Sequence, residues 1–210
     1  MDFYFGRFSG NSARVAFALH EANLSFVPRF IDTSRGDQRA PAYRVIHPVG
    51  RVPVIVDGPL TLWESNAINW YLAEKHPEAG LLPPSVEGRA RVQKWLFFHS
   101  AHVWPACGAV FRAAHAGYLK AWDREPDPAA AEAGRADLAR YLPVLDDALE
   151  GRDWLEERFS IADVTYAAHL WLAQGAGASL SATPRVEGWL ARMLERPAWR
   201  KTAAMIFPDG

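Results

Sequence analysis

HPVGRVPVIVDGPLTLWESNAI, residues 47–68, is the stretch of this 210-residue sequence that decides the fold. Its two extended runs, 52–56 and 60–63, are rich in β-branched and large apolar residues and flank the turn-forming triplet Asp57-Gly58-Pro59. This pattern predicts an antiparallel hairpin. From Ser65 onward the apolar residues recur at helical spacing, so a helix is expected to follow the hairpin directly.

The residues before this stretch complete a small mixed sheet. The aromatic run at 3–5 predicts a strand, and apolar residues at helical spacing between 15 and 22 predict a helix after it. Residues 25–31 favour a second strand, which Pro28 restricts to a sheet edge because proline cannot donate to a strand ladder. A βαβ unit followed by a hairpin is therefore expected within residues 1–78.

The remainder of the chain is expected to form a separate domain. Pro and Gly interrupt residues 76–84 too often for a helix or strand to pass through. Apolar residues then recur at spacings of three and four over about 87–103, 106–122 and 129–149, which predicts three amphipathic helices. The fold class is therefore an α/β N-terminal domain, residues 1–78, and an all-α C-terminal domain, residues 86–210.

Composition and charge exclude several classes of protein. Apolar residues make up 50% of the chain and charged residues 22%, which is typical of a globular protein and not of a disordered one. The net charge of −1 gives no field that would attract nucleic acid or an anionic membrane, so we expect neither as a partner. A single cysteine, Cys107, excludes an internal disulfide and fits a reducing cytoplasm.

Two local features point to a ligand with a peptide backbone and an amino-acid head group. The Val52–Pro53 bond is a candidate cis peptide that would leave the Val52 backbone free to pair with an extended ligand, although an ordinary trans proline at an edge strand is also open. Ser65, expected as the N-cap of the following helix, would offer a carboxylate site at the helix N-terminus. Glu64 beside it would bind an ammonium group, or would simply be an exposed acid next to a capped helix.

These motifs resemble the glutathione-binding signature of the cytosolic glutathione S-transferases. The resemblance rests on residues 47–55 and 62–68 and continues through Phe159-Ser160-Ile161-Ala162-Asp163, where Ser160 and Asp163 also match a capping box. It spans nearly the whole chain. It implies a thioredoxin-like N-terminal domain, an all-helical C-terminal domain and glutathione as co-substrate.

The resemblance also implies roles for individual residues. Glu64 and Ser65 would hold the γ-glutamyl group, Val52 before Pro53 would pair with the cysteinyl backbone, and Arg51 would lie near the glycyl end. In serine-type members the residue that activates the thiol lies just after the first strand and a few residues before an arginine of the first helix. Ser9 matches that position.

Catalysis by this family requires a thiolate, because a free thiol is a weak nucleophile. A hydroxyl aimed at the sulfur at the start of the first helix would stabilise the thiolate. Asn11 remains an alternative donor to Ser9, whereas Ser12 is expected to cap the helix. Tyr4 lies inside the strand and does not match the tyrosine-type pattern.

Other chemistry receives less support from the sequence. No cysteine lies in the loop after the first strand, so the redox chemistry of cysteine-type members is not expected. Cys107 is interpreted as a packed thiol. His99 and His102 share a helix face, but no third ligand is evident, so no metal site is expected.

The sequence therefore predicts a cytoplasmic glutathione transferase that conjugates glutathione to a small hydrophobic electrophile. Residues 88–122 contain no Asp or Glu, and if this basic stretch faces the electrophile it favours an anionic one. The alternatives are a non-catalytic scaffold of the same fold and a glutathione-dependent isomerase or dehalogenase. A homodimer is expected from the resemblance and from the many aromatic residues available for an interface.

Overall fold

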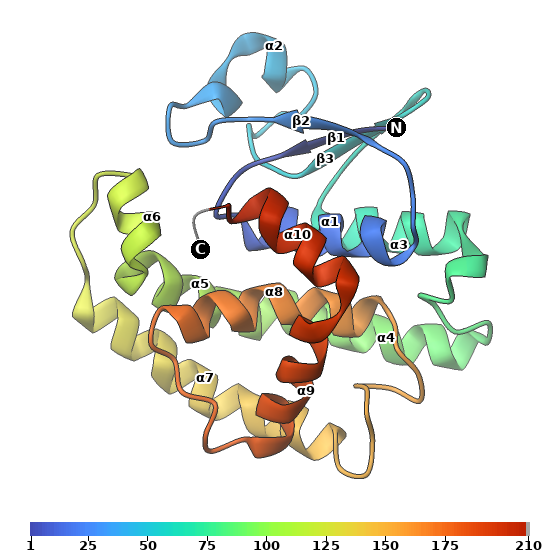
Figure 1. Ribbon diagram of the computed structural model, residues 1–210, viewed down its shortest axis with the longest axis vertical. Coiled ribbons are helices and arrows are strands. Elements are labelled where there is room, and N and C mark those ends of the chain that lie inside the picture. Colours follow the sequence, from blue (N-terminus) through green and yellow to red (C-terminus); the bar gives the residue numbers. More distant parts are fainter. Residues whose placement is uncertain (209–210) are drawn as a thin grey trace. The chain divides into compact units, whose positions relative to one another are not determined.

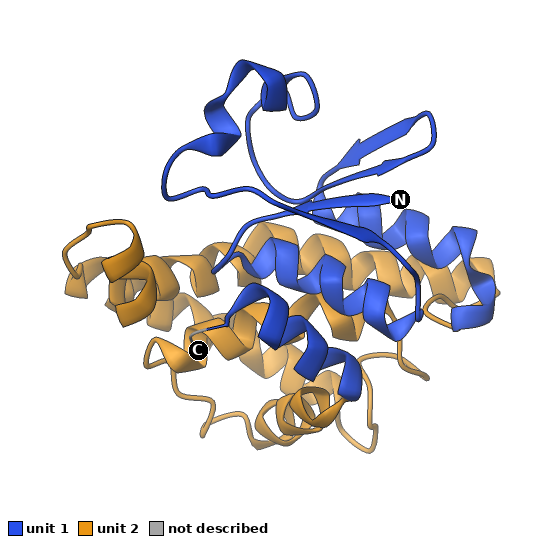
Figure 2. Cartoon of the chain, turned by 45° about the horizontal axis from the view of Figure 1, so that its top comes forward, with its two compact units in different colours: residues 1–79, 197–210 blue, residues 80–196 orange. Residues whose placement is uncertain are grey.

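The computed structural model describes residues 1–208 and divides the chain into two compact units (Figure 2). Unit 1 comprises residues 1–79 together with the described residues from 197 onward, and unit 2 comprises residues 80–196. The division after residue 79 falls within the Pro- and Gly-rich stretch in which the boundary was expected. None of the helices in the described chain combines the length and the apolar character needed to cross a membrane.

Unit 1 is built on a four-stranded mixed sheet with the strand order β2-β1-β3-β4 (Figure 1). The expected βαβ unit is present, because β2 pairs in parallel with β1, whereas β3 and β4 form the expected antiparallel hairpin. The strands are β1 Asp2–Phe5, β2 Val27–Phe30, β3 Val54–Asp57 and β4 Leu60–Trp63. The helical segments are α1 Gly10–Glu21, η1 Asp37–Arg39, α2 Pro41–Arg44, α3 Ser65–Lys75, η2 Pro77–Ala79 and α10 Pro197–Ile206.

Alternation of the side chains places one face of the sheet in the core of unit 1. Phe3 and Phe5 of β1 are 0% and 7% exposed, whereas Tyr4 between them is only partly buried. This is the period of two that a half-buried strand requires. In α1 every residue from Ser12 to Leu19 is buried, so this helix lies in the interior of the unit.

The C-terminal helix departs from the expected domain range of 86–210. Helix α10 packs against α1 (Figure 1). The ring of Trp199 lies 5.5 Å from that of Phe17. The Phe8 N–H also donates to the carbonyl of Ile206 at 3.2 Å. The physical reason is that every residue of α1 from 12 to 19 is buried, and α10 supplies part of the cover that the local sequence pattern does not identify.

Unit 2 is helical throughout its regular structure, and the three amphipathic stretches all form helices. They correspond to α4 with η3, to α5 with α6, and to α7. The second is interrupted at His115, whose backbone is extended and whose Nδ1 accepts the Tyr118 N–H at 3.2 Å to cap α6. The bounds are α4 Val86–Phe98, η3 His99–Val103, α5 Trp104–Ala114, α6 Ala116–Ala121, α7 Pro128–Ala148, α8 Ile161–Gly175 and α9 Pro184–Glu195, with η3 a π-helical segment.

The predicted capping box at the start of α8 is confirmed. Ser160 Oγ accepts the N–H of Ala162, and Asp163 accepts the N–H of Ser160 at 3.0 Å. Asp163 also accepts from the Leu155 N–H and from Trp189 Nε1. Burial raises the pKa of Asp163 to about 6, although these hydrogen bonds lower it. The motif therefore ties the α7–α8 connection and α9 to the first turn of α8.

Candidate active site

The peptide bond between Val52 and Pro53 is cis, so this sequence candidate is confirmed. Val52 lies immediately before β3 and is partly buried, and Pro53 is buried. Within residues 1–208 neither backbone polar group of Val52 makes a hydrogen bond. The Val52 N–H and C=O are thus available to an extended ligand beside the sheet.

Glu64 and Ser65 form the junction between β4 and α3. Glu64 is exposed and has a positive φ of 69°, and Ser65 is the first residue of α3 and 2% exposed. The expected N-cap was therefore wrong by one position, because Glu64 occupies the N-cap and makes no side-chain capping bond. The junction presents a carboxylate next to the N-terminus of a helix, which suits an ammonium group and a carboxylate on one ligand.

Arg14 of α1 is a site residue whose role the sequence analysis missed. Its guanidinium donates to Ser65 Oγ through Nε at 2.9 Å and also through Nη2, and Nη1 donates to Asn66 Oδ1 at 2.9 Å. Arg14 is only 5% exposed, and its carbonyl accepts from Asn69 Nδ2 at 3.2 Å. Burial lowers the pKa of Arg14 to about 9, whereas nearby Glu64 raises it, so the guanidinium is charged at neutral pH.

The three polar residues after β1 have distinct positions. Ser9 is the N-cap of α1, and its Oγ accepts the Ser12 N–H at 3.1 Å. Ser12, which was expected to be the cap, is fully buried and accepts the Gly6 N–H at 3.2 Å. Ser9 keeps its hydroxyl proton for donation because capping uses only an oxygen lone pair.

Asn11 connects this loop to the β4–α3 junction. Ser65 Oγ donates to Asn11 Oδ1 at 3.4 Å, although the two residues are 54 positions apart in the chain. The N-termini of α1 and α3 are thereby brought together. Of the predicted site residues, Ser9, Asn11, Glu64 and Ser65 gather at these two helix starts.

Arg51 lies one residue before Val52, in the loop that leads to β3. Its side chain is exposed, and its carbonyl accepts from Tyr43 Oη at 2.7 Å. His47, in the same loop, is 3% exposed, and its ring lies 5.2 Å from that of Trp63. Burial lowers the pKa of His47, and the charges of Glu64 and Arg51 act on it in opposite directions. The loop therefore lies within electrostatic reach of the Glu64 carboxylate.

Unit 2 holds the remaining residues that the sequence singled out. Cys107 of α5 is 1% exposed, and burial raises the pKa of its thiol, which keeps it protonated and inert. His99 is fully buried against the ring of His169, at 4.9 Å between ring centroids. Among residues 1–208 no group of three or more potential ligands could hold a metal ion.

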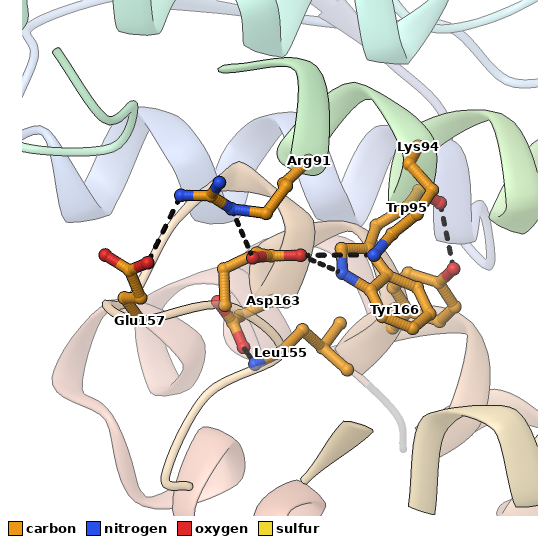
Figure 3. A network of polar contacts seen from close by, with 8 residues as sticks. Arg91, Lys94, Trp95, Leu155, Glu157, Asp163 and Tyr166 are labelled. Carbon is orange, nitrogen blue, oxygen red and sulfur yellow. Dashed lines mark hydrogen bonds and ion pairs between the residues drawn. The ribbon is translucent and has the colours of Figure 1, made fainter. Parts of the chain in front are cut away.

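The basic stretch of residues 88–122 is partly neutralised within unit 2 (Figure 3). Arg91 pairs with Glu156 and Glu157, and Lys94 lies 3.4 Å from Glu156. Trp95 Nε1 also donates to Glu156 at 2.7 Å. The acids that balance these cations therefore come from the α7–α8 connection. Arg112 and Lys120 remain exposed.

Two family descriptions match the chain. "Glutathione S-transferase, N-terminal domain" matches residues 1–74, and "Glutathione S-transferase, C-terminal domain" matches residues 128–192. Glutathione S-transferase 3 of Zea mays is 32% identical over 204 residues, which cover 94% of this chain and 90% of that protein. The disulfide-bond oxidoreductase YfcG of Escherichia coli strain K12 is 32% identical over 94% of this chain and 92% of its own.

Solved structures agree with the sequence relatives. Glutathione transferase F7 from Populus trichocarpa superposes with a TM-score of 0.89 at 25% identity and covers 98% of both chains. A glutathione transferase from Burkholderia graminis, solved with two glutathione molecules per subunit, superposes with a TM-score of 0.83 at 28% identity over 97% of this chain and 87% of its own.

The fold and the two helix starts define an enzyme with a thioredoxin-like domain and an all-α domain. The chain belongs to the glutathione S-transferase family. It is an enzyme that uses glutathione as its co-substrate, as its sequence predicted.

Proposed function

We propose that this glutathione S-transferase converts the thiol of bound glutathione to a thiolate through Ser9, with Asn11 as the alternative donor, and conjugates it to a small hydrophobic electrophile. One observation carries the proposal. Ser65 of α3 and Asn11 of α1 meet at 3.4 Å, so the residues for the γ-glutamyl group and those for the thiol belong to one polar cluster. A ligand with a carboxylate and a thiol can reach both helix starts at once.

The start of α1 suits stabilisation of a thiolate. The first turn of α1 contains no acidic residue, so the positive end of the helix dipole is not opposed there. The Ser9 hydroxyl, half-buried at the N-cap, supplies a hydrogen bond that favours the charged form of the sulfur. Both effects lower the thiol pKa from about 8.5 toward neutral pH.

The remaining contacts to glutathione follow the same geometry. Glu64 would accept the α-ammonium group and Ser65 would donate to the α-carboxylate, whereas the free Val52 N–H and C=O would pair with the cysteinyl backbone beside Pro53. Arg51, with its exposed side chain, would reach the glycyl carboxylate. Each group is matched by a partner of opposite polarity.

The test combines ultraviolet titration of the bound thiol with conjugation rates. Wild-type protein with glutathione should show thiolate absorbance near neutral pH and should conjugate at least one of a panel of aromatic and alkyl electrophiles. Ser9→Ala or Asn11→Ala, whichever removes the true donor, should raise the bound thiol pKa and lower kcat about 10- to 100-fold. Ser181→Ala, at an exposed serine of unit 2, is the matched control. Glutathione binding without thiolate or conjugation would favour the scaffold alternative.

An anionic electrophile is a narrower form of this proposal. With Arg91 and Lys94 paired to acids, only the exposed Arg112 and Lys120 support it among the cations discussed above. An anionic electrophile should react faster than its methyl ester at low salt, and the difference should shrink at high salt. Equal rates at both ionic strengths would remove the preference.

Disulfide reduction is a second candidate, because one relative is a disulfide-bond oxidoreductase. Cys107 is buried, so both thiols would have to come from glutathione: two glutathione molecules would reduce one disulfide to two thiols and become glutathione disulfide. The Burkholderia relative holds two glutathione molecules per subunit, which supports this reaction because a protein of this fold can hold both reductants at once. Release of thiol from a small disulfide, dependent on both glutathione and enzyme, tests it.

The assembly proposed for this enzyme is a homodimer in the cytoplasm. Phe97 and Val86 of α4 are 70% and 78% exposed, and large exposed apolar side chains favour an interface. The single buried cysteine fits a reducing compartment. Sedimentation at micromolar concentration should give twice the 23.4 kDa chain mass, and a monomer would contradict the dimer.

A further inference from the structure

The hydroxyl of Tyr43 holds the one peptide plane that carries the free N–H of Val52. Tyr43 lies on α2 and is 5% exposed, and its Oη donates to the carbonyl of Arg51 at 2.7 Å. That carbonyl belongs to the peptide group between Arg51 and Val52, which is planar and trans. In a trans peptide the C=O and N–H point in opposite directions, so the bond to Tyr43 aims the Val52 N–H away from α2.

Tyr43 is itself fixed at several points. Its carbonyl accepts the N–H groups of Ile46 and His47, each at 2.9 Å, and its own N–H donates to Ala40. Its ring lies 6.0 Å from that of Tyr4 on β1. Burial raises the pKa of the Tyr43 hydroxyl, so it stays protonated and remains a donor. The residue therefore holds both ends of the loop between α2 and β3.

The loop has little freedom of its own. Gly50 has a positive φ of 66° and donates its N–H to the His47 carbonyl at 2.8 Å. A Cβ at Gly50 would lie only 2.4 Å from the Gln38 carbonyl oxygen, so the backbone passes too closely for a side chain. The rotation of the peptide plane between Arg51 and Val52 is the remaining variable, and the Tyr43 hydroxyl sets it.

We infer that Tyr43 is a positioning residue for glutathione: it orients the Val52 N–H toward the cysteinyl carbonyl of the ligand without touching the ligand. This inference rests on the proposed pairing of Val52 with glutathione. Tyr43 is assigned no role at the thiol, because no hydrogen bond links it to Ser9 or Asn11 among the described residues. Its effect should appear in affinity and not in the chemical step.

The test compares two ligands that share a γ-glutamyl group and a thiol. Glutathione has the cysteinyl carbonyl, whereas γ-glutamylcysteamine lacks it. Tyr43→Phe removes only the hydroxyl and should raise the Kd and KM for glutathione about three- to tenfold, with kcat at saturation unchanged. The same variant should bind γ-glutamylcysteamine as tightly as wild type does. Tyr4→Phe, in the adjacent ring, should leave both affinities unchanged.

Each other outcome has a definite meaning. Unchanged glutathione affinity in Tyr43→Phe, or equal weakening for both ligands, would overturn the role of Tyr43. Ser65→Ala should weaken both ligands, because both contain the γ-glutamyl group. If Ser65→Ala weakens both ligands and Tyr43→Phe does not selectively weaken glutathione, the proposed site stands and this inference fails. If wild-type protein binds neither ligand, both the site and the inference fail.

Discussion

Replacement of Arg14 by methionine tests the junction between α1 and α3 most directly. Methionine has a similar length and can fill much of the space, but it leaves Ser65 Oγ and Asn66 Oδ1 without the donors that Arg14 provides. Ser65 is 2% exposed, so water cannot easily replace the lost donor at its hydroxyl. A buried acceptor without a partner costs about 1–3 kcal/mol.

An opposing effect limits the loss of stability. Burial lowers the pKa of Arg14 to about 9, which means that desolvation of the guanidinium works against its hydrogen bonds. Methionine removes that desolvation cost. We therefore expect a net decrease of about 1–3 kcal/mol in the free energy of unfolding, equivalent to a midpoint about 3–10 °C lower for a chain of this size.

Affinity for glutathione should fall more clearly than stability. Arg14 donates into Ser65 Oγ, so the Ser65 proton is directed outward, toward Asn11 in the free enzyme and toward a carboxylate in the complex. Without Arg14 this orientation is lost, and we expect about tenfold weaker binding of glutathione. Arg14→Lys should be intermediate, because an ammonium group keeps the charge but cannot reach both acceptors as the guanidinium fork does.

Thermal unfolding and calorimetric titration with glutathione measure the two effects. Arg35→Met is the matched control, since Arg35 is in the same unit with its side chain 83% exposed. The reasoning would be refuted if Arg14→Met melted at the wild-type temperature and bound glutathione with wild-type affinity.

Three further predictions concern the loop before β3 and the start of α8. Gly50→Ala should destabilise unit 1 by about 1–3 kcal/mol, measured by urea unfolding, because of its positive φ and the nearby Gln38 carbonyl. Neutral His47 accepts the Val49 N–H at Nδ1, and burial lowers the pKa of His47 below the ordinary 6.5. The folded protein should therefore lose stability as the pH falls below about 6.5. His47→Asn keeps an acceptor but cannot titrate, so it should flatten that loss in melting curves from about pH 7 to 5.5. Because burial raises the pKa of Asp163 to about 6, the folded state binds more protons than the unfolded state between pH 4 and 6. The stability contributed by Asp163 therefore falls as the pH rises through that window. Asp163→Asn should remove this slope of stability against pH, and an unchanged slope would show that Asp163 does not cause it.

The order of helices and strands was predictable because it depends on local patterns. The hairpin around Gly58, the edge strand that contains Pro28 and the capping box at Ser160 each follow from residues close together in the chain. Local backbone preferences and side-chain periodicity are sufficient for these features. The assignment of Ser9, Glu64 and the other signature residues to a glutathione site came instead from the resemblance to the glutathione S-transferases.

Long-range contacts explain what the sequence did not reveal. Whether Ser9 or Ser12 caps α1 depends on which hydroxyl the turn after β1 buries, and the Gly6 N–H occupies Ser12. The place of α10 depends on an aromatic contact between Phe17 and Trp199, which are far apart in the chain. Neither partner carries a local signal for the other.

What the sequence determined by itself is the family, the succession of elements and the list of polar residues at the two helix starts. What only the tertiary structure decided is how those residues act on one another: Arg14 reaches across 51 positions to Ser65, and Tyr43 reaches eight residues forward to the carbonyl of Arg51. The physical reason is that a hydrogen bond of a side chain depends on distance and direction within about an ångström. Those quantities are set when the packed core fixes the backbone, and composition and spacing alone do not contain them.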